Sequence, residues 1–318
     1  MAKQGATVSK YKKKPATVRR RQPTKKQAKA IARSETKELA RPLGSFNLCA
    51  QVFRIMGRYW KVLGGIILIY LVLNIIFASG ISSITSTVGA IKDDLKNVGV
   101  QPHPLVSAST GFLVLVASAG SSSSAAGSAL QAMLIILISL VIIWALRQLL
   151  AGKAVVLKQA FYNATGQLVP FLLVILVIFI QLLPVTFGVS VLAAVAAAVG
   201  NIGGLGTVVL TILMLLLAAW SAYMLSSSIF ALYIVTLPNM HPRAALRSAK
   251  NLVRYRRFLV LRRVIFMPIV LLVLAAIIII PLILYATFLV APLFFVLGGL
   301  ALLFMHTYLY SLYRGLLG

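Results

Sequence analysis

The stretch VLGGIILIYLVLNIIFAS, residues 62–79, contains no charged side chain and hardly any polar one. About 20 such residues cross the hydrocarbon core of a bilayer as an α-helix, so this stretch predicts a transmembrane helix. Five runs of the same kind follow, at Ala129–Leu146, Leu168–Ala198, Gly206–Leu237, Val264–Tyr285 and Ala291–Tyr310. The sequence therefore predicts an all-α integral membrane protein with about six transmembrane helices.

The composition of the whole chain agrees with a bilayer as its solvent. Of the 318 residues, 60% are hydrophobic and only 11% are charged, and the mean hydropathy is +0.98. These values lie outside the range of soluble domains. A soluble globular fold is excluded.

The positive charges are distributed unevenly between the segments that connect the predicted helices. Of the 31 Lys and Arg, 17 precede residue 62, 2 lie between the first two runs, 3 between the second and third, 8 between the fourth and fifth, and 1 follows the sixth. Cytoplasmic loops are enriched in Lys and Arg. Six crossings with both termini in the cytoplasm put all but two of these charges inside, which predicts that topology.

The first 44 residues differ from the rest in composition. They are rich in Lys, Arg, Thr and Gln and have few large apolar side chains, so they bury too little surface to offset the entropy of ordering. We expect residues 1–44 to form a disordered basic cytoplasmic tail. Residues 45–318 then form the six-helix transmembrane domain, with an external loop at about 80–128 whose apolar part, Gly111–Ala119, is too short to cross the bilayer.

An amphipathic stretch precedes each odd-numbered run: Ser45–Lys61, Lys153–Gln167 and Pro242–Arg263. Such helices lie at the membrane interface with their apolar side in the acyl region. Pro242 suits the first turn of a helix, where its missing N–H is not needed. We expect a cytoplasmic basic helix over about 242–263.

Five cations fall within one arc of that helix at about 100° per residue: Arg243, Arg247, Lys250, Arg254 and Arg257. The functional interpretation is that they bind anionic phospholipid headgroups or an acidic surface of a membrane protein partner. The alternative is that they only fix the orientation of the chain during insertion. The sequence leaves both open.

The segment Ser226–Pro268, which reads SSSIFALYIVTLPNMHPRAALRSAKNLVRYRRFLVLRRVIFMP, resembles bacterial multi-pass families in which a span runs into a short helix with Pro, Ala-Leu and Ser. The membrane domain that precedes some glycerophosphodiester phosphodiesterases is similar. The residues that match are Pro242, Ala245, Leu246, Arg247 and Ser248, whereas residues 238–241 lack the acidic residue usual there. The resemblance implies a six-span domain over about Ser45–Tyr313, without the catalytic domain.

Residues for catalysis or metal binding are scarce. The only acids are Glu35, Glu38, Asp93 and Asp94, all outside the predicted spans, so no carboxylate pair is available within the membrane. The three His residues are far apart in sequence, and His306 beside Tyr308 is expected to be a hydrogen-bonded packing residue. Cys49 is the single cysteine, too few for a disulfide or a thiolate cluster. We expect no enzyme activity, no catalytic residue, no metal site and no cofactor.

Three functions remain open. The first is a non-enzymatic multi-pass protein of a bacterial inner (plasma) membrane that contacts anionic lipids or a membrane protein complex through its basic helices. The second is a small-molecule or lipid transporter, for which the polar residues available within the spans are Asn74, Gln181, Ser226, Ser227 and Ser228. The third is a tether for nucleic acid or ribosomes through the basic tail, which is not favoured because the tail has few aromatic residues to stack on bases.

Overall fold

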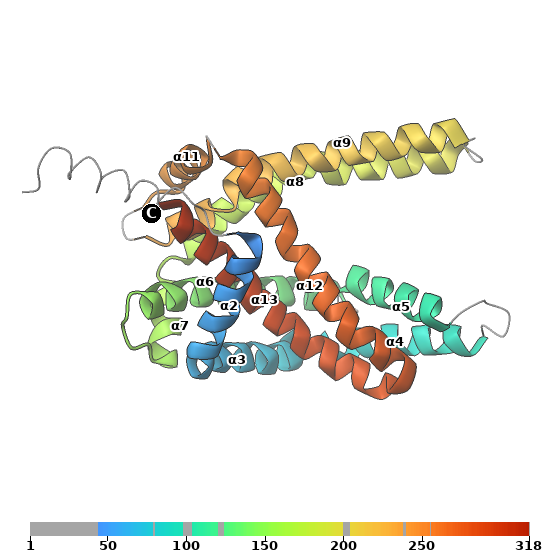
Figure 1. Ribbon diagram of the computed structural model, residues 1–318, viewed down its shortest axis with the longest axis horizontal. Helices are drawn as coiled ribbons and strands as arrows, with labels where there is room; N and C mark the ends of the chain where they lie inside the picture. Colours follow the sequence, from blue (N-terminus) through green and yellow to red (C-terminus); the bar gives the residue numbers. More distant parts are fainter. Residues whose placement is uncertain are drawn as a thin grey trace, which may run out of the picture. The chain divides into compact units, whose positions relative to one another are not determined.

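The computed structural model describes residues 44–78, 80–97, 104–119, 124–199, 204–237, 240–254 and 256–317, and every regular element in these ranges is an α-helix (Figure 1). The helices are α2 (Ser45–Arg58), α3 (Trp60–Ala78), α4 (Gly80–Asn97), α5 (Pro104–Ser118), α6 (Ala125–Leu150), α7 (Leu157–Thr165), α8 (Leu168–Val199), α9 (Gly204–Ser228), α10 (Ala231–Val235), α11 (Pro242–Val253), α12 (Arg257–Tyr285) and α13 (Thr287–Leu317). The expected basic tail lies outside these ranges, apart from Gly44.

Six helical stretches of the described chain are long and apolar enough to cross a membrane, which confirms the predicted fold class. They are α3, α6, α8, α9 together with α10, α12 and α13. The fifth and sixth are joined through Ala286 alone and form a tight hairpin. The amphipathic helices α2, α7 and α11 directly precede α3, α8 and α12.

The main core is built around α13. Its last turns, from Leu303 to Tyr313, are almost wholly buried and pack against α2, α3 and α6. Gly299 allows a close approach between α13 and α3, because a Cβ at this position would lie 3.1 Å from Ile67 Cγ2 and 3.2 Å from Leu71 Cδ2. The backbone of α13 therefore lies directly against side chains of α3 at this level.

The segment expected as an external loop, about 80–128, contains the two helices α4 and α5. Hydroxyl groups on α4 donate to carbonyls of their own helix, as Thr85 does to Ile81 at 2.8 Å. Because the hydroxyls are satisfied locally, the apolar side of α4 is free to pack. Its Val88 and Ile91 form a second core with Phe112 and Leu115 of α5 and with residues of α12 and α13. Neither helix is among the six spans, as expected for Gly111–Ala119.

The fourth predicted run, Gly206–Leu237, is interrupted. Helix α9 ends at Ser228 and the short α10 begins at Ala231. Three consecutive serines precede the break, and Ser226 and Ser227 each donate to the carbonyl three residues earlier, at 2.8 and 2.9 Å. Such bonds compete with the helical ladder and favour bending.

The single basic helix expected over 242–263 is divided. Helix α11 ends at Val253, and α12 begins at Arg257 and continues into the membrane span. Two of its expected residues, Arg262 and Arg263, therefore belong to the first turns of a spanning helix. Arg263 is only 4% exposed, because it lies inside the packed helices rather than on a surface.

Helices α8 and α9 run side by side as a pair (Figure 1). Gly188 of α8 lies directly against α9, since a Cβ there would lie 2.2 Å from Leu217 Cδ2. In the most apolar stretch of each of these two spans, only 11% and 6% of the residues are buried within the described structure. Most of this apolar surface is therefore available to lipid.

Candidate functional site: a cationic surface and a membrane cavity

Helix α11 presents cations on one side and small residues on the other. Ala245, Ala249 and Val253 are buried against α8, α9 and α10. Arg243, Arg247 and Lys250 are exposed, as is Arg254 at the C-cap. Small residues let α11 lie close to its neighbours while the long cationic side chains extend away from them. The structure thus brings together four of the five predicted residues.

The fifth predicted residue, Arg257, has a different environment. It is the first residue of α12, and its guanidinium donates a hydrogen bond to the hydroxyl of Tyr223 on α9. The guanidinium carbon also lies 5.1 Å from the centroid of the Tyr223 ring, a cation–π distance. Arg257 therefore joins α12 to α9.

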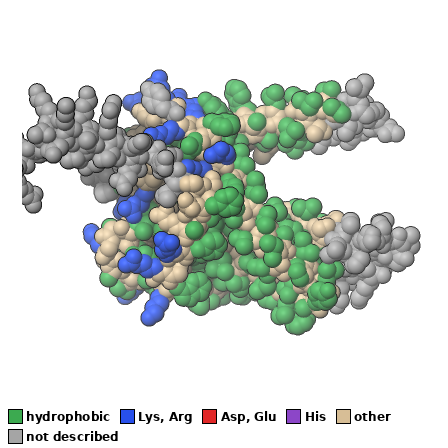
Figure 2. All heavy atoms as spheres, in the orientation of Figure 1, with side chains coloured by type: hydrophobic (Ala, Val, Ile, Leu, Met, Phe, Trp, Pro, Cys, Tyr) green, Lys and Arg blue, Asp and Glu red, His purple; other side chains and the backbone are tan. Residues whose placement is uncertain are grey.

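The other two amphipathic helices also carry exposed cations. Arg54 and Arg58 lie on α2, and Lys158 lies on α7. Figure 2 shows Lys and Arg side chains gathered toward one end of the helices on the face in view. We call the exposed cations of these three helices and their flanking residues the cationic surface: Arg54, Arg58, Lys61, Lys153, Lys158, Arg243, Arg247, Lys250 and Arg254.

No acidic residue occurs in the sequence from residue 98 to residue 318. Helices α6 to α13 therefore supply no carboxylate that could neutralise the cations of α7 and α11. An anion bound at this part of the cationic surface has to come from a lipid, a solute, another protein or another part of the chain.

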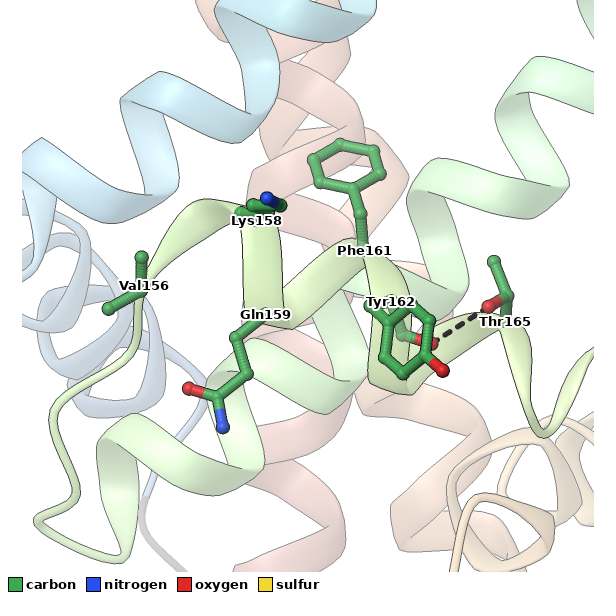
Figure 3. Close-up of a pocket in the computed structure, with 6 residues that line it drawn as sticks. All are labelled: Val156, Lys158, Gln159, Phe161, Tyr162 and Thr165. Carbon is green, nitrogen blue, oxygen red and sulfur yellow. Dashed lines mark hydrogen bonds between the residues drawn. The ribbon is translucent and has the colours of Figure 1, made fainter.

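Beside Lys158 lies an open hollow of about 750 Å³, lined by Val156, Lys158, Gln159, Phe161, Tyr162 and Thr165 (Figure 3). Tyr162 is 81% exposed, and its carbonyl accepts a hydrogen bond of 2.8 Å from the Thr165 hydroxyl. Phe161 and Gln159 point to opposite sides of α7 in Figure 3. The hollow is formed by one surface helix and its N-terminal flank, so it places apolar surface next to a cation at the membrane interface.

Hydrogen bonds connect α10 and the residue after it with α6 and with α13. The Arg147 guanidinium at the end of α6 donates to the carbonyl of Thr236 just after α10. His306 of α13 is 4% exposed, and its Nδ1 lies 3.2 Å from the hydroxyl of Tyr233. This confirms the interpretation of His306 as a hydrogen-bonded packing residue.

A separate cavity of about 500 Å³ lies among α3, α4, α5, α6, α12 and α13. Its polar residues include Tyr70 and Asn74 of α3 and Gln131 of α6. Asn74 Nδ2 donates to the Tyr70 hydroxyl at 3.3 Å. Asn74 was expected from the sequence as a polar residue within a span. Gln131 was not, since a polar residue near the end of an apolar run is ordinary at an interface.

The other polar residues expected within the spans do not line this cavity. The Ser228 hydroxyl of α9 donates to Gln181 Oε1 of α8 at 2.6 Å, so these two side chains satisfy each other. Ser226 and Ser227 bond to their own helix. Among the residues that the structure describes, no group of three or more His, Cys, Asp or Glu is placed to hold a metal ion.

Comparisons with known proteins return no match, neither to a family model, nor to a curated protein, nor to a solved structure.

Proposed function

We propose that this chain is a non-enzymatic multi-pass protein of a bacterial plasma membrane, with both termini in the cytoplasm, whose cationic surface binds the headgroups of anionic phospholipids. One observation carries the proposal: exposed cations line amphipathic helices that precede the first, third and fifth spans, and the sequence has no Asp or Glu from residue 98 to residue 318. Odd-numbered spans of an alternating bundle start on the same side, so the three helices share one interface. The positive-inside rule assigns this interface to the cytoplasm.

The energetics favour lipid headgroups as the anion. Each Lys or Arg near an anionic leaflet contributes about 1 kcal/mol, and four such residues lie on or next to α11 alone. The apolar hollow beside Lys158 adds a place for an acyl chain next to a headgroup. A complementary acidic surface on a membrane protein partner is the runner-up, since the same cations suit it. We also propose that the six-span domain is related to the membrane domain that precedes some glycerophosphodiester phosphodiesterases, because α11 carries the residues that match it.

The test uses the full purified chain in a zwitterionic detergent. Bound lipids are counted by native mass spectrometry during titration with phosphatidylglycerol or with phosphatidylcholine. We expect the wild-type chain to prefer phosphatidylglycerol, and the variant R243Q/R247Q/K250Q/R254Q to lose at least about tenfold of this preference. Because the purified protein is already inserted and folded, an effect on orientation during biosynthesis does not enter the measurement.

The matched control keeps the charge and changes the side chain. The variant R243K/R247K/R254K should retain the preference, since attraction to a headgroup depends chiefly on charge. An unchanged preference in the glutamine variant would refute lipid binding by α11 and leave two roles for these cations, contact with an acidic partner surface or orientation during insertion.

A further inference from the structure

Helix α7 carries a cation near its start and borders an apolar cavity near its end. Lys158 is exposed and lines the open hollow of about 750 Å³. Phe161 and Thr165, about one and two turns further along α7, line the same hollow. At 100° per residue, Thr165 lies about 20° and Phe161 about 60° from Lys158 around the helix. The three side chains therefore form one strip along α7 that leads from a positive charge to apolar surface.

A second, smaller cavity of about 140 Å³ adjoins this strip, because Phe161 and Thr165 line it as well. The hydroxyl of Thr165 donates to the carbonyl of Tyr162 at 2.8 Å. Apolar cavities of roughly this size stay dry and accept apolar molecules. The cavity therefore suits hydrocarbon rather than a polar group. Its remaining walls are all apolar and come from α3, α6 and α7: Leu73, Leu134, Leu137, Ile138, Leu140, Val141 and Ala164.

The cavity lies beside the membrane-spanning part of α3. The side chain of Leu157, which directly precedes Lys158, packs on Gly65 of α3, because a Cβ at Gly65 would lie 3.0 Å from Leu157 Cδ1. Leu73, which lines the cavity, follows Gly65 by eight positions on α3, which corresponds to about 12 Å along the helix. Since α3 runs inward from Trp60, the strip leads from the level of Lys158 toward the hydrocarbon core.

The charge of Lys158 determines the class of ligand. The sequence has no Asp or Glu from residue 98 to residue 318, so helices α6 to α13 supply no counter-charge. The phosphate of a lipid headgroup supplies one, and it is joined to hydrocarbon chains of the kind that the cavity accepts. Gln159 and Tyr162 are exposed and also line the hollow, and their amide and hydroxyl groups can donate to phosphate or glycerol oxygens. A cation beside an apolar cavity thus matches the two ends of one phospholipid.

We propose that α7, together with α3 and α6, binds one anionic phospholipid as a discrete ligand. Its phosphate lies at Lys158, and one acyl chain enters the cavity between the three helices. The inference rests on the proposed function, of which it names one site and the part of the lipid that each end of the site holds. Because the cavity admits only one chain, binding here saturates, unlike contact of α11 with a leaflet.

The experiment uses the full chain in phosphatidylcholine nanodiscs that contain increasing fractions of a phosphatidylglycerol with a photoreactive diazirine in one acyl chain. After illumination, labelled peptides are mapped by mass spectrometry. We expect labelling of α3 and α6 at the cavity to saturate, and to be suppressed by unlabelled phosphatidylglycerol but not by phosphatidylcholine. Labelling of the α8–α9 pair should instead rise in proportion to the probe, because most of its apolar surface is available to the surrounding lipid.

Two variants test the two ends of the site. Lys158→Gln should weaken the apparent affinity of the saturable labelling about fivefold, because it removes one cation at a leaflet surface, whereas Lys158→Arg should retain it. Leu137→Trp should abolish the saturable labelling by filling the cavity. Should the tryptophan variant fail to fold, as thermal unfolding would show, the Lys158 pair and the two competitors still decide the question.

Each variant has a matched control. Lys153→Gln removes an exposed cation just before α7 that lines neither the hollow nor the cavity. Met133→Trp places the same large ring one turn before Leu137 on α6, at a side chain that is 58% exposed and does not line the cavity. Both controls should label like the wild-type protein.

Three results would each overturn this site: labelling at the cavity that does not saturate, equal suppression by phosphatidylcholine, or an unchanged apparent affinity in folded Lys158→Gln protein. The variant R243Q/R247Q/K250Q/R254Q separates the site from α11, since it leaves α7 intact and should keep the labelling. A lost lipid preference in that variant, combined with unsaturable labelling at α7, would refute this site and leave the proposed function standing. Saturable labelling at α7 with an unchanged preference in that variant would instead refute lipid binding by α11 alone.

Discussion

The hydroxyl of Tyr308 on α13 donates a hydrogen bond to the backbone carbonyl of Arg263 on α12, with 3.1 Å between the two oxygens. Tyr308 is fully buried, and its ring also stacks on that of Phe304. The bond joins the last two spans at the level where α12 enters the membrane. Its removal leaves a buried carbonyl with one partner fewer.

Tyr308→Phe should therefore lower the free energy of unfolding by about 1 kcal/mol, because it removes the hydroxyl and keeps the ring. The measurement is unfolding by sodium dodecyl sulfate titration in mixed micelles. Tyr285→Phe is the control, since Tyr285 is 88% exposed at the end of α12, and it should change stability by less than about 0.5 kcal/mol. Equal effects of the two substitutions would contradict a structural role for the Tyr308 hydroxyl.

The hydrogen bond between Ser228 and Gln181 gives a second prediction. Ser228→Ala removes the hydroxyl that donates to Gln181 Oε1 over 2.6 Å. The free energy of unfolding should therefore fall by about 1 kcal/mol, because a contact between α8 and α9 is lost. Ser227→Ala removes only a bond within its own helix and should have little effect. Thermal unfolding monitored by circular dichroism compares the two variants, and a larger loss for Ser227→Ala would argue against this contact.

The closeness of α4 and α5 gives a third prediction. A Cβ at Gly111 would lie 2.8 Å from Ile91 Cγ2, and this methyl group is held near the backbone of α4. Gly111→Val should destabilise the protein by about 1–3 kcal/mol through overpacking. Gly89→Val on α4 is its control, because a Cβ at Gly89 meets nothing within 4 Å. The ratio of monomer to aggregate after heating, read by size-exclusion chromatography, should fall only for the first variant.

The chemistry of Cys49 gives a fourth prediction. Cys49 is 9% exposed on α2, and burial raises the pKa of its thiol above the ordinary value. Since the thiolate is the reactive form, alkylation between pH 7 and 9 should be slow in the folded protein and at least about tenfold faster after unfolding in detergent. A raised pKa in the folded state also means that this group favours folding below its ordinary pKa and loses that contribution as the pH rises through the folded value.

An exposed neighbour on α2 supplies the comparison for Cys49. Ala50→Cys in a Cys49→Ser background moves the thiol by one position, from a buried to an exposed site. It should react at the rate of the unfolded chain. Equal rates for the two positions would show that α2 does not bury residue 49.

The orientation of the chain gives a fifth prediction. Single cysteines at positions 107, 201, 248 and 317, each in the Cys49→Ser background, are treated in intact cells with a maleimide that does not cross membranes. With six spans and cytoplasmic termini, only positions 107 and 201 should react before lysis. Labelling at position 248 would place α11 outside the cell and remove the basis for its contact with the inner leaflet.

The six spans are predictable from the sequence because each needs only local information, an uncharged run of sufficient length. The interruptions between these helices and their neighbours are harder to predict from the sequence. Ser226–Ser228 and Arg254–Arg256 contain no Pro or Gly, so the breaks before α10 and α12 depend on side-chain hydrogen bonds and on packing with other helices. The packing of α4 and α5 likewise depends on α12 and α13, which lie far along the chain.

The candidate sites were predictable to a similar degree. The cations of α11 follow from helical spacing, apart from Arg257, whose contact with Tyr223 of α9 is a tertiary one. Asn74 is recognisable in the sequence as a polar residue within an apolar run, and it lines the cavity in the structure. The cavity itself did not follow from the sequence, because its volume arises from six helices whose relative positions no local pattern specifies.

Helix α8 contains 32 residues, which corresponds to about 48 Å at 1.5 Å per residue. The hydrocarbon core of a bilayer is only about 30 Å thick. The excess length forces α8 to tilt strongly, to carry its last turns past the headgroups, or to thicken the lipid around it. Because α9 packs along α8, a bilayer thinner than the length of α8 acts on the two helices together.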